Sequence, residues 1–351
     1  MNANMNTEEF QNAILNWSQI HGRKNLPWQT NINAYSVWIS EIMLQQTQVQ
    51  TVIPYFKKFM ARFPTISALA TADINDVLHY WTGLGYYARA RNMHKTAQLV
   101  SNKFSGELPS MIEDLINLPG IGRSTAGAIR SIAFKKPAAI LDGNVKRVLA
   151  RYGGIKGWPG HSATSKELWG LAEAMSPSSQ TDLYTQAMMD LGATVCTKNP
   201  DCKNCPVKSG CAAFNQGDIQ SYPGKKPKKV LPIRRCCFLV ISNNCGEILL
   251  QQNPLMGIWG GLWMFPQCED VSMVNSKCEN MGFKLSTKKI LALRRHSFSH
   301  FHLDYYPIYI QAQISGTHLK NDRQDQLWYD PKNPTELGMP TPAVKIFEDF
   351  R

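Results

Sequence analysis

Two different patterns of hydrophobic positions divide the chain. Over residues 8–215 apolar side chains recur every three or four positions, which is the spacing of amphipathic helices. Pro or Gly marks most of the joints between the periodic segments. Helices are expected at Glu8–His21, Tyr35–Gln50, Pro54–Phe63, Ile74–Trp81, Ala90–Asn102, Ser110–Leu118, Ser124–Phe134, Val145–Tyr152, Thr164–Met175 and Leu183–Leu191.

The last third of the chain has short runs of branched and aromatic residues instead, which are typical of strands. We expect strands at Cys236–Ser242, Ile248–Gln252, Lys289–His296 and Asp304–Gln313. Between the two patterns lies a segment with three prolines and a lysine cluster, which cannot form a helix. The pattern predicts an all-α domain over residues 1–220, a basic Pro-rich linker over 221–235, and a smaller α+β domain over 236–351.

Composition and charge narrow the possible classes of protein. The 351 residues are 43% hydrophobic and 18% charged, which excludes a disordered or collagen-like chain. Residues 1–220 carry a net charge of +6, the linker another +6, and residues 236–351 none. This placement favours a phosphate backbone as partner of the first two segments, although a basic surface kept for solubility has the same charge. The chain has no apolar run of membrane-spanning length and a polar N-terminus, so we expect a cytoplasmic protein.

Four of the nine cysteines are clustered at the end of the helical part. Cys196, Cys202, Cys205 and Cys211 have the spacing C-x5-C-x2-C-x5-C, so four thiolates can surround one cofactor. Structural zinc usually takes two close pairs separated by a longer finger. One close pair between two longer arms suits an iron–sulfur cluster better, and zinc remains the alternative.

Two further segments have candidate chemistry. Leu118-Pro-Gly-Ile-Gly-Arg-Ser-Thr-Ala126 is a joint between two helices, and Gly120 and Gly122 let its backbone approach a ligand closely. N–H groups at the start of the following helix favour a phosphate. Asp142 stands before the next helix, where an ordinary N-cap is an alternative to a catalytic role.

Together with these segments, several others resemble a known family. They are Leu26-Pro-Trp28, Ser40-Glu-Ile-Met-Leu-Gln-Gln-Thr-Gln-Val49, Gly83-Leu-Gly-Tyr-Tyr-Ala-Arg-Ala-Arg-Asn92 and Phe298-Ser-His300. The chain resembles the helix–hairpin–helix DNA glycosylases of the endonuclease III superfamily, and among them the MutY type, over essentially its whole length. The resemblance implies one 4Fe-4S cluster on the four cysteines, although the family pattern has six residues where this chain has five after Cys196.

MutY-type enzymes remove adenine that is mispaired with 8-oxoguanine or guanine, and the base must first be flipped out of the duplex. The resemblance implies that Glu41 protonates the adenine, that Asp142 remains ionised and stabilises the sugar cation, and that Asn144 supports them. Desolvation on a largely apolar helix would raise the pKa of Glu41. An exposed Glu on an amphipathic helix is the competing interpretation.

Ser124 occupies the position at which strand-cutting relatives carry a lysine nucleophile. A hydroxyl cannot form the imine that such cleavage requires, so the resemblance implies a monofunctional glycosylase. The alternatives are a bifunctional glycosylase and lyase of the endonuclease III type, a non-catalytic iron–sulfur redox sensor that binds DNA, and a Nudix hydrolase.

The resemblance also places the substrate contacts, with duplex DNA as partner and a monomer as the expected state. An adenine pocket is implied for four residues, although buried core is the alternative for the apolar ones: Leu26, Trp28, Gln29 and Gln186. DNA or lesion contacts are implied for Gln46, Thr47, Leu84, Tyr86, Gly120, Gly122, Ser124, Phe298, Ser299 and His300.

Residues 236–351 resemble a Nudix, MutT-like fold through Gly257-Ile-Trp-Gly-Gly-Leu-Trp-Met-Phe-Pro266. A catalytic Nudix helix needs several acids to hold magnesium, whereas Val274-Asn-Ser-Lys-Cys-Glu279 has one. We therefore expect no catalytic magnesium and a role in recognising 8-oxoguanine. A metal site formed by His296, His300 and His302 is a weaker alternative.

Overall fold

The computed structural model describes residues 6–227, 230–314 and 325–349. These residues form two compact units, one of Met1–Thr71 with Asn92–Lys228 and the other of Ala72–Arg91 with Lys229–Arg351. Residues 72–91 thus pack with the C-terminal part of the chain, which differs from the predicted range of 1–220 for one domain. Two bonds that hold them there run from Gln252 Nε2 to Asn75 Oδ1 over 2.7 Å and from the Tyr87 hydroxyl to the Met339 carbonyl over 3.0 Å.

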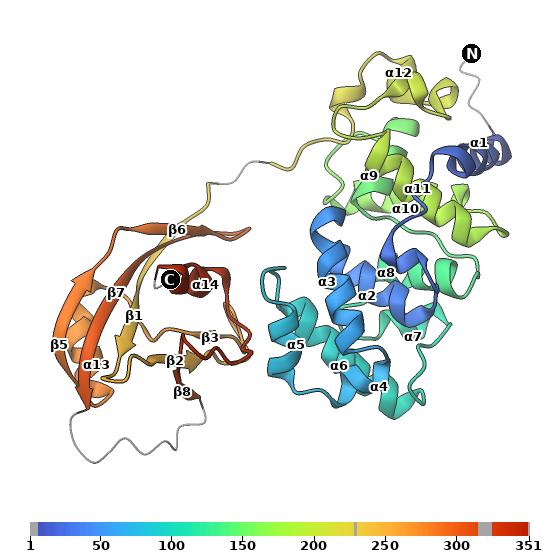
Figure 1. Ribbon diagram of the computed structural model, residues 1–351. Helices are drawn as coiled ribbons and strands as arrows, with labels where there is room; N and C mark the ends of the chain where they lie inside the picture. Colours follow the sequence, from blue (N-terminus) through green and yellow to red (C-terminus); the bar gives the residue numbers. More distant parts are fainter. Residues whose placement is uncertain (1–5, 228–229, 315–324, 350–351) are drawn as a thin grey trace. The chain divides into compact units, whose positions relative to one another are not determined.

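The first unit is built of helices (Figure 1). Its α-helices are α1 (Thr7–His21), α2 (Ala34–Leu44), α3 (Val49–Arg62), α4 (Ile66–Thr71), most of α6 (Ala88–Lys103), α7 (Ile112–Ile116), α8 (Arg123–Ala128), α9 (Gly143–Tyr152), α10 (Ser162–Met175), α11 (Thr181–Thr194) and α12 (Ala212–Asn215). The prediction of an all-α first part is confirmed.

The centre of this unit is formed by α2, α9 and α11, which have many buried side chains. Figure 1 shows α9 and α11 side by side, and α1 also packs on α11. Helix α2 packs on α3 and α8, and Trp38, Ile39 and Met43 of α2 are fully buried. A helix with so little polar surface is expected inside the unit, and Glu41 is on this helix.

Several predicted helices have different ends in the structure. The helix expected at Tyr35–Gln50 ends at Leu44, and the helix expected at Pro54–Phe63 is α3, which begins at Val49. Between them Gln46 has a left-handed backbone with φ +58°, which a helix does not accept. The helix expected at Ser124–Phe134 is α8 followed by a π-helical turn at Ile129–Ala133.

The second unit contains the described strands. They are β1 (Ile233–Ser242), β2 (Ile248–Gln252), β3 (Trp263–Met264), β4 (Gln267–Cys268), β5 (Phe283–Ile290), β6 (Arg294–Ser297), β7 (His302–Ile314) and β8 (Gln326–Tyr329). The main order is β3-β2-β1-β7-β5, with β1 and β7 parallel and the other pairs antiparallel. The expected α+β domain is confirmed.

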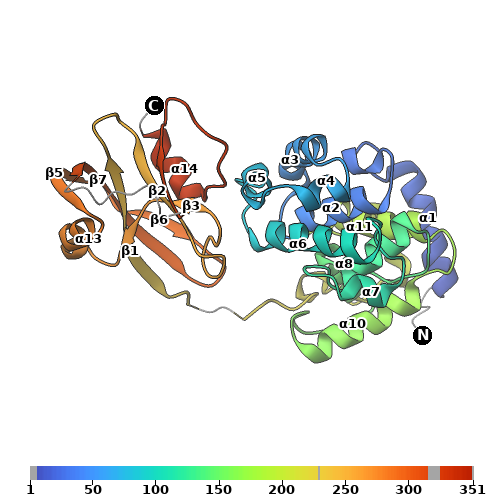
Figure 2. The same cartoon turned by 90° about the horizontal axis from the view of Figure 1, so that it is seen from below.

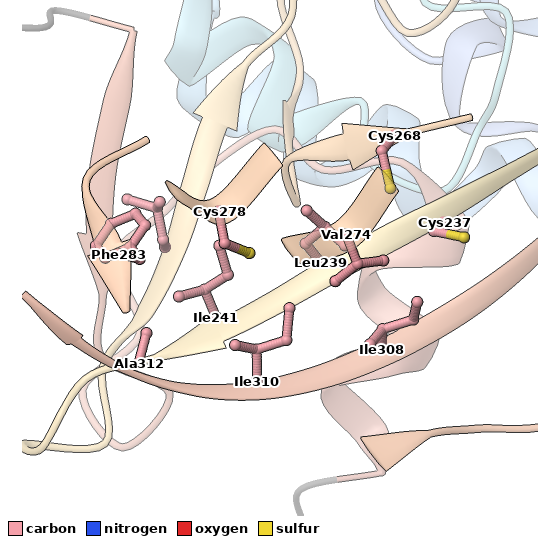
Figure 3. Packing of buried hydrophobic residues seen from close by; sticks show 11 residues of the cluster. Cys237, Leu239, Ile241, Cys268, Val274, Cys278, Phe283, Ile308, Ile310 and Ala312 are labelled. Atoms are coloured by element: carbon pink, nitrogen blue, oxygen red, sulfur yellow. The ribbon is translucent and has the colours of Figure 1, made fainter. Parts of the chain in front are cut away.

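Helices cover both faces of this sheet (Figure 2). On one face α13 (Val274–Asn280) contributes Val274 and Cys278 to a core that contains Leu239 and Ile310 (Figure 3). On the other face α14 (Thr341–Glu348) places Phe347 against Phe265 and Tyr329, with ring centroids 5.1 Å apart in both pairs.

The strand expected at Lys289–His296 was wrong in its bounds. The chain forms β5 up to Ile290 and then β6 from Arg294, and both strands pair with β7. Exposed charged residues on both sides of the break obscured the alternation that marks a strand.

The predicted linker is shorter than residues 221–235. Tyr222 is buried in the first unit, where its carbonyl accepts a hydrogen bond from Arg151 Nε over 3.0 Å, and β1 already begins at Ile233. Lys228 and Lys229 of this linker lie outside the described residues. No helix in the described part of the chain is long and apolar enough to cross a membrane.

Candidate active site and cofactor loop

Glu41 is a half-buried carboxyl on an apolar helix. Its neighbours in the sequence, Ile39 and Ile42, are buried in the interior. Burial, and after it the negative charge of Asp142, raise the pKa of Glu41 to about 8. The carboxyl is therefore protonated at neutral pH and can supply a proton.

Asp142 is the N-cap of α9 and accepts a hydrogen bond of 2.7 Å from the backbone N–H of Val145. Asp142 therefore caps α9 and also lies close enough to Glu41 for its charge to act on that carboxyl. Burial raises the pKa of Asp142, against the opposing effects of the Val145 and Asn144 N–H groups and of Arg147 and Lys146. Desolvation is the largest of these effects.

The two carboxyls have different electrostatic surroundings. The negative charge of Asp142 adds to the burial that raises the pKa of Glu41, whereas two backbone N–H groups and the cations Arg147 and Lys146 oppose the effect of burial on the pKa of Asp142. These surroundings favour a proton on Glu41 and a negative charge on Asp142. One acid with a proton and one carboxylate beside it form the arrangement that acid-assisted cleavage of a glycosidic bond uses.

Helix α8 joins the segments that carry these acids. The Ser124 hydroxyl accepts a hydrogen bond of 3.0 Å from the Leu141 N–H, directly before Asp142. Gln45 Nε2, at the end of α2, lies 3.5 Å from the Thr125 hydroxyl. Ser124 therefore fixes the backbone that leads into the Asp142 cap.

Arg147 connects α9 to two other segments, and the sequence analysis did not single it out. Its guanidinium donates to Asn144 Oδ1 over 2.9 Å, to the Gly192 carbonyl over 2.6 Å and to the Cys196 carbonyl over 2.6 Å. Asn144 is thereby held by an arginine that also contacts the cysteine loop. The sequence contained one indication of this contact, because Arg147 stands one helical turn after Asn144 on the same helix.

The four clustered cysteines line one cavity next to α9. The thiols are close enough that the charges of Cys196 and Cys211 contribute to the raised pKa of Cys205, although burial is the larger cause. Arg151, which is buried, donates to Cys196 Sγ over 3.4 Å and to the Thr197 carbonyl over 2.6 Å. Among the described residues, no group of three or more His, Cys, Asp or Glu side chains is arranged so that it could hold a metal ion. A cavity with four thiols on its walls fits a cofactor with several iron atoms.

Two of the four predicted pocket residues share a hollow. Gln29 and Gln186 line it together with residues of α1 and α11. Leu26 and Trp28 are buried, and the Trp28 ring meets Phe56 edge-on at 5.5 Å between centroids. The hollow also contains Asp190, which the sequence analysis missed because a lone acid on a helix gives no signal.

The hairpin between α7 and α8 has the expected glycine geometry. Gly120 has φ +81°, a conformation that other residues adopt only with strain. A side chain at Gly122 would meet no protein atom within 4 Å, so this glycine leaves its backbone open to an outside ligand.

The predicted wedge residues lie in the two separate units. Gln46 is exposed in the first unit, with Thr47 half-buried beside it. Tyr86 belongs to the second unit, is 49% exposed and has φ +49°, while Leu84 next to it is buried. Left-handed backbone at both Gln46 and Tyr86 is uncommon and often marks a functional site.

The loop after β6 has exposed polar side chains next to a cluster of packed aromatic rings. The Phe298 ring stacks on Phe301 at 4.5 Å and lies 5.3 Å from Trp259. Ser299 and His300 are exposed beyond it. The loop can therefore offer hydrogen-bonding groups to a ligand without disturbing its own packing.

Known proteins share this architecture. The model of HhH-GPD superfamily base excision DNA repair proteins matches residues 39–174, and that of the NUDIX domain matches residues 236–349. The adenine DNA glycosylase of Buchnera aphidicola subsp. Acyrthosiphon pisum (strain APS) is 41% identical, over 97% of both chains. The chain belongs to the adenine DNA glycosylase family. The Homo sapiens adenine DNA glycosylase is 43% identical over 97% of this chain and 74% of its own.

Solved structures agree with this family for the helical part. A thermostable thymine-DNA glycosylase aligns with a TM-score of 0.54 and 27% identity, over 60% of this chain and 97% of its own. Endonuclease III in a non-covalent DNA complex shares the fold, with a TM-score of 0.50 and 21% identity, over 61% of this chain and 98% of its own. This adenine DNA glycosylase family member is therefore a base excision repair glycosylase with a C-terminal NUDIX domain.

Proposed function

We propose that this enzyme hydrolyses the N-glycosidic bond of adenine that is mispaired with 8-oxoguanine or guanine in duplex DNA. The observation that carries the proposal is the pair of carboxyls, in which burial and the negative charge of Asp142 raise the pKa of Glu41 to about 8. The names of the family relatives support adenine as the excised base.

Each carboxyl has one task in this reaction. Glu41 donates its proton to the imidazole nitrogen of the flipped adenine, which turns a poor leaving group into a neutral one. As the bond breaks, positive charge develops on the sugar, and the Asp142 carboxylate stabilises that charge. Asn144, held by Arg147, keeps the start of α9 in place. Deprotonated Glu41 then activates the attacking water.

The reaction ends at an abasic site. Cleavage of the strand requires an amine that condenses with the sugar aldehyde, and a serine hydroxyl forms no imine. The Ser124 hydroxyl is also engaged by the Leu141 N–H. We therefore propose a monofunctional glycosylase.

The cofactor is proposed to be one 4Fe-4S cluster on Cys196, Cys202, Cys205 and Cys211. When bound, such a cluster supplies four iron–thiolate bonds that close the loop. The loop is tied to α9 by Arg151 and Arg147. These residues hold the loop against the helix that begins at Asp142.

Binding of the duplex is proposed for the hairpin at Gly120 and Gly122, which grips a phosphate without reading sequence. Gln46 and Tyr86 would fill the stack after the adenine leaves it, with Thr47 and Leu84 supporting them. Phe298, Ser299 and His300 are proposed to sense 8-oxoguanine, with serine and histidine as hydrogen-bonding groups. With one acid, Glu279, on α13, the NUDIX domain is proposed to recognise the lesion and not to hydrolyse pyrophosphate. We propose that one chain acts as a monomer.

The test is single-turnover incubation with end-labelled duplexes that carry adenine opposite 8-oxoguanine, guanine or thymine, with and without alkali. We expect alkali-dependent cleavage at adenine opposite 8-oxoguanine and guanine only, and none with Asp142→Asn. Cleavage without alkali would indicate the lyase. Binding without base release would indicate the non-catalytic sensor.

A further inference from the structure

A buried carboxylate supports a side chain that the family resemblance places in the adenine pocket. Asp190, on α11, is 1% exposed and accepts a hydrogen bond of 2.8 Å from Gln186 Nε2. Gln186 stands one helical turn before it on the same helix, and both residues line the hollow that Gln29 also lines.

Arg23 also binds the Asp190 carboxylate, through the oxygen that Gln186 contacts and through the other oxygen. The Arg23 backbone N–H donates to Oδ2 over 2.8 Å, and its Nε donates to Oδ1 over 2.7 Å. A terminal nitrogen of the guanidinium lies 2.6 Å from Oδ1 as well. Two directions of contact from one residue fix the plane of the carboxylate, so it cannot turn away from Gln186.

This arrangement determines which end of the Gln186 amide faces the hollow. An ionised carboxylate only accepts hydrogen bonds, whereas an amide has a donor end and an acceptor end. The nitrogen of Gln186 must therefore face Asp190, and its carbonyl oxygen must face away. In the described part of the chain, no hydrogen bond to Gln186 Oε1 competes for that oxygen.

We infer that Asp190 is a positioning residue that sets base specificity by locking Gln186 as a hydrogen-bond acceptor. The inference rests on the proposed excision of adenine and on the family resemblance, which implies that Gln186 lines the adenine pocket. An acceptor at this point suits the exocyclic amino group of adenine. It repels the carbonyl oxygen that a 6-oxopurine has at the same position, because two acceptors then face each other.

The experiment compares Asp190→Asn with the wild type on duplexes that carry adenine or hypoxanthine opposite 8-oxoguanine. An asparagine has one acceptor oxygen for the N–H groups of Arg23 and Gln186 that the two oxygens of Asp190 accept. When its amide nitrogen faces Gln186, the Gln186 amide flips and donates to the 6-oxo group. We expect the ratio of single-turnover rates for adenine over hypoxanthine to fall at least tenfold. Adenine and hypoxanthine differ in how readily they leave the sugar. Because this difference is the same for the variant and the wild type, it cancels when their ratios are compared.

Two controls separate positioning from general loss of structure. Asp182→Asn removes another acid that lines the same hollow but pairs with Lys135, so the ratio should stay within twofold of the wild type. Gln186→Ala should lower the ratio as Asp190→Asn does, and the double variant should lower it no further. If Asp190→Asn does not fold, as judged by thermal unfolding, Asp190→Glu is measured by the same criterion, because it keeps the charge beside Arg23 and displaces the acceptor.

An unchanged ratio in the folded Asp190 variant, or equal loss of rate on both bases, would overturn the inference. Failure of the proposed function gives a different result, because the wild type would then release no adenine from any of the duplexes. If the wild type releases adenine but the Asp190 variants have the same ratio of rates for adenine over hypoxanthine, only the positioning role of Asp190 is contradicted.

Discussion

The negative charge of Asp142 acts on Glu41, and with burial it raises the pKa of the Glu41 carboxyl to about 8. The two residues come from different helices, since Glu41 lies within α2 and Asp142 begins α9. In the proposed reaction Glu41 keeps its proton and Asp142 its negative charge, and together they would supply both functions that glycosidic cleavage needs.

Replacing Glu41 by Gln is expected to lower the single-turnover rate at least 100-fold, because the amide has no proton of suitable acidity to donate. For the wild type, the rate should fall as the pH rises through about 8, where Glu41 loses its proton. A pH–rate profile that is flat between 6 and 9 would contradict the assignment of Glu41 as the acid.

The substitution Glu41→Gln should also change how the stability of the protein depends on pH. The pKa of Glu41 is higher in the folded chain than in the unfolded chain, so its contribution is fully present below the unfolded pKa and is lost as the pH rises through about 8. Glu41→Gln lacks this loss. Its free energy of unfolding, relative to that of the wild type, should therefore increase by roughly 4–5 kcal/mol between pH 4 and pH 9, measured by urea unfolding.

Ser124 leads to a prediction about covalent chemistry. Incubation of the wild type with substrate duplex and borohydride should trap no protein–DNA adduct above the level of Asp142→Asn, because no imine forms at a serine. Ser124→Ala should remain monofunctional and lose about 1 kcal/mol of stability, since the Leu141 N–H loses its acceptor. Efficient trapping with the wild type would show that another amine performs lyase chemistry.

Arg147→Lys keeps a positive charge but loses the planar group that reaches Asn144 and the carbonyls of Gly192 and Cys196. We expect the single-turnover rate to fall roughly 10–100-fold, because the start of α9 is displaced. Arg130→Lys is the matched control, since Arg130 binds the carbonyls of Ser110 and Pro137 instead. Equal effects of the two substitutions would indicate a general loss of stability.

The loop after β6 is tested by the combined substitution Ser299→Ala and His300→Ala. Both side chains are exposed, so folding should be unaffected. The preference for adenine opposite 8-oxoguanine over adenine opposite guanine should decrease, while the rate on the guanine mispair stays the same. An unchanged preference would remove this loop from lesion recognition.

The sequence predicted the helices that have a clear apolar stripe, and it placed α1 and α10 to within one or two residues. It failed where a single backbone conformation decides the result. The left-handed Gln46 ends α2 six residues before the predicted end, and no pattern of hydrophobic residues signals that turn. Short strands such as β3, with two residues, give too little periodicity to be recognised.

Within the site, the resemblance to a family identified Glu41, Asp142 and the four cysteines. The residues that hold them were missed, because their importance comes from contacts between distant parts of the chain. Asp190 meets Arg23 across 167 positions, and Arg147 meets Cys196 across 49. Only the folded chain shows that these pairs are in contact.

The most direct test of the central claim is the pKa of Glu41, measured by carbon-13 NMR of its side-chain carboxyl, with Glu41→Gln to assign the signal. The wild type should titrate at about 8. In Asp142→Asn the pKa should fall, because one negative charge is removed, but it should stay above that of an exposed glutamate, because burial remains. A pKa near 4.5 in the wild type, or the same pKa in both proteins, would contradict the account.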